Sequence, residues 1–142
     1  MDDRQMKAQD LALRGHNIVI TGQGGTGRTF LIKQLCKDLS KKGTSYAVTS
    51  TAGLGATLFG RATTIHKFIG FEDGRHQNNQ LLYLIQTDER FLTAKSNILN
   101  TDVLIIDEVS MLSSKVLKQI EYVCRGVRKK EKYFGGMQVV LS

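Results

Sequence analysis

The apolar residues of this chain fall into two kinds of run, one short and continuous and the other spread over helical spacing. The short runs are typical of β-strands. They lie at Ile18–Thr21, Tyr46–Thr49, Val103–Ile106 and Met137–Leu141. The run at Val103–Ile106 contains no polar residue, which is typical of a strand buried on both faces of a parallel sheet.

Apolar residues that recur every three or four positions predict the helices. Residues 3–13 predict a short helix, and a longer one runs to about Lys42, where Gly43 ends it. A third helix is the clearest, because its apolar residues share one face and Ser113 or Ser114 can cap its start. Those apolar residues are Val116, Leu117, Ile120, Val123, Cys124 and Val127.

Strands that alternate with helices predict an α/β domain with a mostly parallel sheet, whose ligand lies outside the carboxyl ends of the strands. A length of 142 residues with 41% hydrophobic content suits one domain over residues 1–142. Two parts of the pattern are less regular. Short helix and loop are expected over Ser50–Ala56 and Thr63–His66, and residues 71–101 give no clear pattern.

A glycine-rich turn follows the first predicted strand and opens the longer helix, which is the context of a phosphate-binding loop. In such loops backbone amides wrap the nucleotide phosphates, lysine reaches the outer phosphates, and Ser or Thr holds Mg²⁺. An ordinary glycine turn is the alternative, but it does not require a strand before it and a helix after it. The predicted nucleotide-binding residues are Gly22, Gln23, Gly24, Gly25, Thr26, Gly27, Arg28 and Thr29.

Arg28 stands where the usual loop has lysine. A guanidinium group is a broad planar fork and an ammonium group is a compact charge, so the two are not interchangeable in a tight loop. We expect nucleotide to bind through the backbone amides and Thr29. We expect hydrolysis to be weakened because the outer phosphate is misplaced, which makes Arg28 a catalytic as well as a binding residue.

Two acidic residues, Asp107 and Glu108, end the apolar strand run. A carboxylate at the end of a buried strand can bind the water shell of Mg²⁺ that Thr29 and the phosphates hold, so Thr29 and Asp107 are the predicted metal ligands. The neighbouring Glu108 can orient or deprotonate the attacking water, and both carboxylates are predicted to be catalytic. A solvated acidic turn is the alternative.

The net charge of +7 is concentrated in residues 28–70, where seven Lys or Arg face one Asp for a local charge of +6. Such an excess suits a polyanion, because cations neutralise phosphates and release counterions. The alternative is a solvated helix face, since Lys33, Lys37 and Lys41 repeat every four residues opposite leucines. We assign that face to solvent.

Composition also bears on the cellular setting. Cys36 and Cys124 lack the close Cys/His spacing of a zinc site, so both are expected in the core. The sequence has no apolar run of membrane-spanning length, and Asp2 and Asp3 are followed by no hydrophobic segment. We therefore expect a soluble, intracellular protein that needs no membrane.

Five segments, in order, resemble successive motifs of the PIF (petite integration frequency) DNA helicases. The resemblance covers nearly the whole chain and implies a P-loop NTPase fold, the first of two RecA-like three-layer motor domains of a superfamily-one helicase. Members couple ATP hydrolysis to 5′-to-3′ movement on single-stranded DNA, so ATP, Mg²⁺ and single-stranded DNA are the implied cofactors and partner. The segments are Thr21–Thr29, Val48–Leu54, Thr63–Phe68, Ile105–Met111 and Phe134–Gln138.

The resemblance also implies roles for single residues. Gln5 matches the family's adenine-reading glutamine, although by itself it fits any exposed helix position. The predicted DNA-binding residues are Ser50, Thr51, Gly53, Thr64, His66, Lys67 and Phe68. Hydroxyls and backbone amides can hold phosphates, while the rings of His66 and Phe68 can stack on bases. Core packing is the alternative for Phe68.

The family pattern continues beyond Ser142 into a sensor segment and a second motor domain that supplies arginine fingers. Without an arginine finger the rate of such a motor falls about a thousandfold or more, so we expect this chain alone to hydrolyse ATP weakly or not at all. Family roles in DNA repair, recombination and telomere maintenance are implied. A monomer is expected, in the nucleus or mitochondrion of a eukaryotic cell.

Three functions remain open from the sequence. The first is the nucleotide-binding half of a DNA helicase motor. The second is a non-catalytic nucleotide- or DNA-binding module, which Arg28 favours. The third is a different P-loop enzyme such as a small-molecule kinase, which leaves the Thr64–Phe68 resemblance unexplained.

Overall fold

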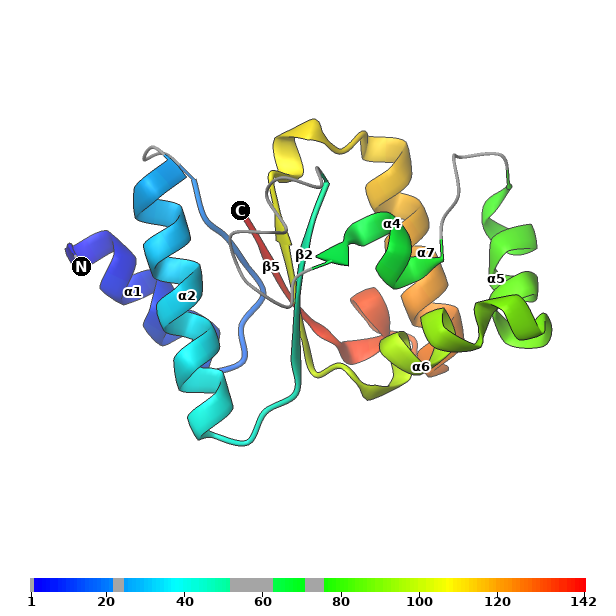
Figure 1. Ribbon diagram of the computed structural model, residues 1–142, viewed down its shortest axis with the longest axis horizontal. Coiled ribbons are helices and arrows are strands. Elements are labelled where there is room, and N and C mark those ends of the chain that lie inside the picture. The colour runs from blue at the N-terminus through cyan, green and yellow to red at the C-terminus, as the bar shows by residue number, and fades with distance from the viewer. Residues whose placement is uncertain (1, 22–24, 52–62, 71–75) are drawn as a thin grey trace.

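The computed structural model places a parallel β-sheet between two layers of helices (Figure 1). It describes residues 2–21, 25–51, 63–70 and 76–142, and of residues 25 and 26 the backbone alone. The strand order is β1-β5-β4-β2-β3, and all neighbours run parallel. The strands are β1 (Ile18–Val19), β2 (Tyr46–Ser50), β3 (Thr63–Thr64), β4 (Val103–Asp107) and β5 (Gln138–Leu141). The predicted α/β fold with a parallel sheet is confirmed.

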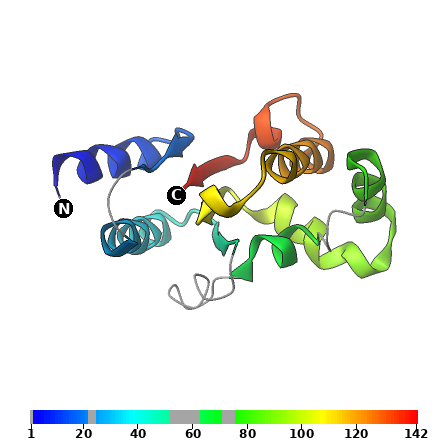
Figure 2. The same cartoon turned by 90° about the horizontal axis from the view of Figure 1, so that it is seen from above.

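The helices divide between the two faces of this sheet (Figures 1 and 2). One face carries α1 (Asp3–Leu13) and α2 (Gly25–Lys41). The other carries α4 (Ile65–Ile69), α5 (Asn78–Thr87), α6 (Leu92–Asn100) and α7 (Ser114–Arg128). Short 3₁₀ turns lie at η1 (Glu89–Phe91), η2 (Val109–Met111) and η3 (Tyr133–Gly136).

Each face of the sheet has its own apolar core, because successive strand residues point to opposite faces. In β4, Leu104 and Ile106 join the core under α4–α7, while Val103 and Ile105 join the core under α1 and α2. Leu104, Ile105 and Ile106 are 0% exposed. The continuous apolar run is therefore explained by a central strand covered on both sides.

The two long helices match their sequence patterns. In α7 the residues Ile120, Val123, Cys124 and Val127 are buried, and the Ser113 hydroxyl accepts a hydrogen bond from the Val116 amide at 3.1 Å. Ser113, of the two serines proposed, is thus the cap. The lysines assigned to solvent in α2 are exposed, and α2 is followed by Gly43 at φ +71°. Cys124 is buried as expected, while Cys36 is half-buried.

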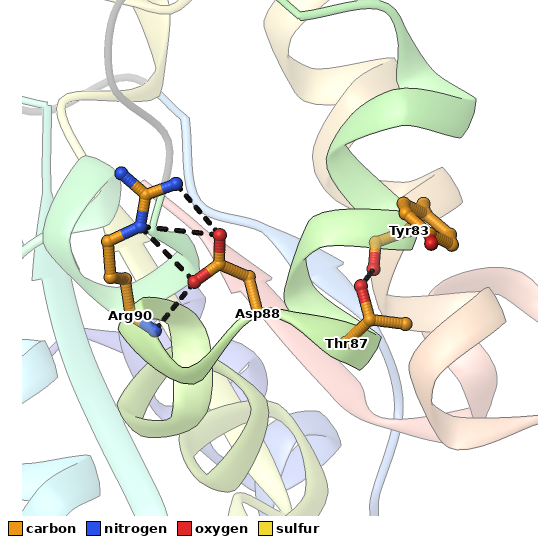
Figure 3. A network of polar contacts seen from close by, with 4 residues as sticks. All are labelled: Tyr83, Thr87, Asp88 and Arg90. Carbon is orange, nitrogen blue, oxygen red and sulfur yellow. Dashed lines mark hydrogen bonds and ion pairs between the residues drawn. The ribbon is translucent and has the colours of Figure 1, made fainter.

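The region without a clear pattern contains two short helices, α5 and α6, joined at Asp88 (Figure 3). The Asp88 carboxylate accepts hydrogen bonds from the Arg90 guanidinium at 2.8 Å and the Arg90 amide at 2.9 Å. Both bonds favour the charged form and lower the pKa of Asp88 to about 2. Close by, the Thr87 hydroxyl donates to the Tyr83 carbonyl at 2.7 Å and closes the last turn of α5.

One expectation on the fold was incomplete. Thr63 and Thr64 form a short strand beside β2, where helix and loop were predicted. Two residues carry too little pattern to indicate a strand, and it is the pairing with β2 that makes one. Within the described ranges, every helix is too short or too polar to cross a bilayer.

Candidate functional site

The carboxyl ends of the central strands bring the predicted chemistry to one edge of the sheet. Ser50 at the end of β2 is in register with Asp107 at the end of β4 and with Thr64 at the end of β3. These three residues come from segments far apart in sequence, and they lie side by side because the strands are parallel. This edge is where ligands bind in open parallel sheets.

The two acidic residues differ in surroundings and backbone. Asp107 is the last residue of β4 and is 8% exposed. Glu108 is half-buried and follows with φ 56° and ψ 39°, a left-handed conformation that few residues other than glycine adopt. A sharp turn therefore separates the two carboxylates, which argues against the plain solvated turn considered above.

Neighbouring strand ends hold Glu108 in this conformation. The Ser50 hydroxyl donates to Glu108 Oε1 at 2.8 Å, and the Thr51 hydroxyl donates to the Glu108 carbonyl at 2.9 Å. On the other side, the Val109 amide donates to the Ser142 carbonyl at 2.8 Å. The sequence did not indicate these contacts, although parallel strands that end together bring their following residues close.

The phosphate-binding loop is partly visible. Gly22, Gln23 and Gly24 lie outside the described residues, and Gly25 and Thr26 are described by their backbone alone. The described backbone runs from β1 to Thr21 and resumes at Gly25, where α2 begins. Gly27, Arg28 and Thr29 lie in the first turns of α2. Helix amino termini attract anions, so this arrangement suits a phosphate group.

Gln5 joins the N-terminal helix to this loop. Its amide Nε2 donates to the Gly27 carbonyl at 3.3 Å, and its Oε1 accepts from the Asp2 amide at 3.0 Å. Asp2 in turn caps α1 by accepting from the Gln5 amide at 2.8 Å, which completes a capping box. The half-buried Gln5 is therefore not just any exposed helix residue, and it lies where α1 meets the loop.

A pocket of about 170 Å³ lies between α1, the end of β1 and the start of α2. Its lining includes Gln5, Val19, Thr21, Gly27 and Arg28. Arg28 Nε is buried without a hydrogen-bond partner among the described residues. An unpaired buried guanidinium nitrogen is costly and is satisfied by an anion, so the donor set fits a nucleotide phosphate.

Mg²⁺ has two candidate ligands here. Asp107 supplies a carboxylate at the strand edge and Thr29 a hydroxyl on α2, both oxygen donors of the kind that Mg²⁺ prefers. Within the described ranges no three His, Cys, Asp or Glu residues cluster. A site built from one carboxylate, one hydroxyl and substrate phosphates does not need such a cluster.

The predicted DNA-binding residues differ in how far their side chains are exposed to solvent. Lys67 is exposed, and Thr51, Thr64 and His66 are half-buried. The Thr64 hydroxyl caps α4 by accepting from the Lys67 amide at 3.2 Å. Gly53 lies outside the described residues. Lys67 therefore offers the most accessible cation of this group to a polyanion.

Two residues of that group, Ser50 and Phe68, are buried. Phe68 is 3% exposed and belongs to the core under α4–α7, so its ring is not available for stacking on a base. Ser50 is 0% exposed and its hydroxyl is directed to Glu108. Both lie at positions that pack inward, which the motif resemblance does not reveal.

Comparison with known proteins identifies the family. A sequence model described as PIF1-like helicase matches residues 4–142. The chain belongs to the PIF1-like helicase family. The ATP-dependent DNA helicase PIF1 of Saccharomyces cerevisiae is 35% identical over 134 residues, which are 92% of this chain and 15% of the yeast protein.

Solved structures of PIF1-like helicases share the fold. The Pif1 helicase of Candida albicans superposes with a TM-score of 0.90 at 32% identity, covering 99% of this chain and 32% of that one. A Bacteroides Pif1 in complex with ADP-AlF3 and single-stranded DNA has a TM-score of 0.76 at 27% identity, covering 99% and 31%. The chain thus spans less than a third of these relatives.

Proposed function

We propose that this chain is the ATP-binding part of a DNA helicase motor, which binds Mg-ATP and single-stranded DNA. The observation that carries the proposal is the meeting of Asp107, Glu108, Ser50 and Thr64 at one sheet edge, beyond which α2 begins at the phosphate loop. In a longer protein with a second motor domain, ATP hydrolysis at this edge would drive 5′-to-3′ unwinding.

The ligands of a relative support this proposal. The Bacteroides Pif1 structure holds ADP-AlF3, which is ADP with aluminium fluoride in the place of the outer phosphate, together with single-stranded DNA. At 27% identity and near-complete coverage of this chain, the same two ligand classes are the natural candidates here. DNA repair, recombination and telomere maintenance are proposed as its settings, in the nucleus or mitochondrion, with the protein acting as a monomer.

In the proposed mechanism each residue has a separate task. Gln5 would bind the adenine, and its hydrogen bond to the Gly27 carbonyl would connect the adenine site to the phosphate loop. Backbone amides of the phosphate loop and the Arg28 guanidinium would hold the phosphates. Thr29 and Asp107 would hold Mg²⁺, which would supply charge neutralisation. Glu108 would accept the proton of the water that attacks the outer phosphorus, while the bond from that phosphorus to the bridging oxygen breaks and ADP leaves.

Arg28 is proposed to weaken the hydrolysis step. Its Nε is buried beside the pocket, and its broad planar guanidinium has a different shape from the compact, rotatable ammonium of lysine. In a longer protein with a second motor domain, Arg28→Lys is expected to raise turnover by roughly a hundredfold to a thousandfold, the scale of one stabilising donor at a transition state. The matched control is Arg14→Lys, because Arg14 is an exposed arginine at the C-terminal cap of α1 and is not among the residues that line the pocket.

The second candidate is a non-catalytic nucleotide- or DNA-binding module, which the arginine at the lysine position favours. The discriminating experiment measures ATP hydrolysis with and without single-stranded DNA. It uses this chain and an extended version that continues through the remaining helicase region of the yeast relative. Stimulation by DNA in the extended version supports the motor. Nucleotide binding without hydrolysis in that version, even after Arg28→Lys, assigns the module instead.

A further inference from the structure

A group of exposed cations lies where α7 ends, at the amino end of the sheet. The turn η3 leads from α7 into the start of β5, whereas Asp107 and Ser50 lie at the carboxyl ends of their strands. All strand pairs are parallel, so the two groups lie at opposite ends of the sheet (Figure 1). A strand of four residues such as β5 is about 13 Å long, which separates these cations from Asp107.

The lysines of this group are not neutralised by the acidic residues beside them. The Glu121 carboxylate lies 3.0 Å from the Arg125 guanidinium, and the Glu131 carboxylate lies 4.0 Å from it. Both nearby acids are therefore directed to an arginine. Within the described part of the chain, the exposed lysines here form no ion pair; they are Lys129, Lys130 and Lys132.

Gly136 brings two of these lysines together. Lys130 Cδ lies 3.6 Å and Lys132 Cδ 4.0 Å from the point that a Cβ at Gly136 would occupy, so both side chains lie over a residue that has none. Like charges gathered in one place repel, and an anion between them removes the repulsion. The negative end of α7 accounts for Lys129, its C-cap, but this field acts only within the last turn of a helix.

The turn that presents these lysines is fastened to α7 at two points. The Phe134 amide donates to Glu121 Oε2 at 3.2 Å, and Arg128 Nε donates to the Gly135 carbonyl at 2.9 Å. Phe134 has a φ of 55°, which is unfavourable for a residue with a side chain and persists where surrounding contacts enforce it. A turn held in this way loses little conformational freedom when a ligand binds to it.

Tyr133 adds a flat aromatic ring next to the lysines. Its side chain follows Lys132 directly and is 80% exposed. Bases of a single strand stack on exposed aromatic rings with little sequence preference, while neighbouring cations hold the phosphates. An acidic protein segment would pair with the lysines and does not require the ring. The combination therefore favours a nucleic acid strand.

We propose that Lys129, Lys130, Lys132 and Tyr133 form a second surface for single-stranded nucleic acid, which we call the amino-end surface. The lysines would contact about three phosphates, and the tyrosine would stack on one base. This inference goes beyond the proposed function, because neither ATP nor the carboxyl end of the sheet takes part in it.

The test measures the affinity of this chain for a short fluorescein-labelled thymidine oligonucleotide by anisotropy, between about 50 and about 200 mM salt. Every protein in the series carries Lys67→Gln, which removes the exposed cation of the predicted DNA-binding group. Changing the three lysines of the amino-end surface to glutamine is expected to lower the slope of log affinity against log salt by about 2, since each phosphate contact contributes about 0.7.

Tyr133→Ala is expected to weaken the affinity about fivefold or more without changing the salt slope, and Tyr133→Phe to keep the affinity. An oligonucleotide that contains 5-iodouridine is expected to form its photochemical cross-link with Tyr133. The matched control changes Lys33, Lys37 and Lys41 to glutamine, which removes the same charge from the exposed face of α2. This control is expected to keep the slope of the parent.

Four results would overturn the inference. They are a parent with no measurable affinity, equal effects of the two triple variants on the slope, a cross-link confined to residues outside 129–136, and full affinity in Tyr133→Ala with polyglutamate competing as well as thymidine oligonucleotide at equal charge. The last of these assigns the surface to an acidic protein. The proposed function is tested separately, because the triple lysine variant of the extended version is expected to hydrolyse ATP like its parent.

Discussion

The turn before β5 contains two adjacent glycines whose substitution separates two physical effects. Gly135 and Gly136 both have positive φ, at +63° and +81°. A methyl group added at Gly135 lies 2.7 Å from the Cys124 carbonyl oxygen and 2.7 Å from Arg128 Cβ. At Gly136 the nearest atom is a lysine side-chain carbon at 3.6 Å. Gly136→Ala therefore meets backbone strain alone, while Gly135→Ala meets strain and a collision with α7.

The magnitudes follow from these distances. Left-handed backbone costs a residue other than glycine about 1–2 kcal/mol, which is the whole loss expected for Gly136→Ala. Overpacking against fixed atoms adds about 1–3 kcal/mol, so Gly135→Ala is expected to lose about 2–5 kcal/mol of unfolding free energy. For a domain of this length 1 kcal/mol is roughly 3–4 °C in Tm, which gives losses of roughly 3–8 °C for Gly136→Ala and roughly 6–20 °C for Gly135→Ala.

The assay is thermal and urea unfolding of this chain, followed by circular dichroism. Equal losses in the two variants, or a larger loss for Gly136→Ala, would refute the collision argument. A change in the slope of the urea transition would indicate an altered unfolded state instead. The comparison also tests whether the Phe134–Gln138 motif has a structural role, since Gly135 also accepts from Arg128 Nε at 2.9 Å.

Two further predictions concern buried groups. The Arg128 guanidinium donates hydrogen bonds to the carbonyls of Gly135, Ile98 and Thr101 at 2.9, 2.9 and 3.1 Å, and a lysine ammonium cannot reach all three. Arg128→Lys is therefore expected to lower the free energy of unfolding, measured in urea, by about 1–3 kcal/mol. A loss below roughly 0.5 kcal/mol, the scale of an ordinary surface substitution, contradicts this role. Burial raises the pKa of Cys124 to about 12 and that of Cys36 to about 11, so a thiol reagent at pH 8 should label the native chain far more slowly than the urea-unfolded chain. Both pKa values in the folded chain exceed the ordinary 9.0, so the contribution of the neutral thiols to the free energy of unfolding is fully present below pH 9 and is lost as the pH rises toward 11–12. The urea midpoint should fall over that range. Labelling of the native chain as fast as that of the unfolded chain would contradict the burial of both thiols.

The spacing of apolar residues correctly predicted the helices and strands that bury one face or both faces in the core. The helix over Ser114–Arg128 and the strand over Val103–Asp107 have long apolar patterns that allow one solution. The helices α5 and α6 lie in the region that was not interpreted. Each is only about ten residues long, and the chain turns between them at Asp88 without glycine or proline to mark the break.

The site was predictable in its composition and less so in its contacts. The resemblance located Gln5, and the spacing of Asp2 to Gln5 is itself a capping-box signature that indicates a helix start. Core packing of Phe68 was one of the two alternatives open from the sequence, whereas the inward direction of Ser50 was not predictable, because it is the last residue of a short strand. Their burial depends on β3 and α4 packing beside β2, which is a tertiary effect.

The two apolar cores of unequal extent have a consequence for local motion. Among the described residues, the cluster under α4–α7 is the larger, and α1 adds only Ala12 to the buried core of the opposite face. Segments with few buried apolar contacts open first, so amide hydrogens of α1 should exchange with solvent sooner than those of α7. The helix α1, which carries Gln5, is thus less firmly anchored than α7, and a nucleotide that bridges α1 and α2 would slow the exchange of α1 amides.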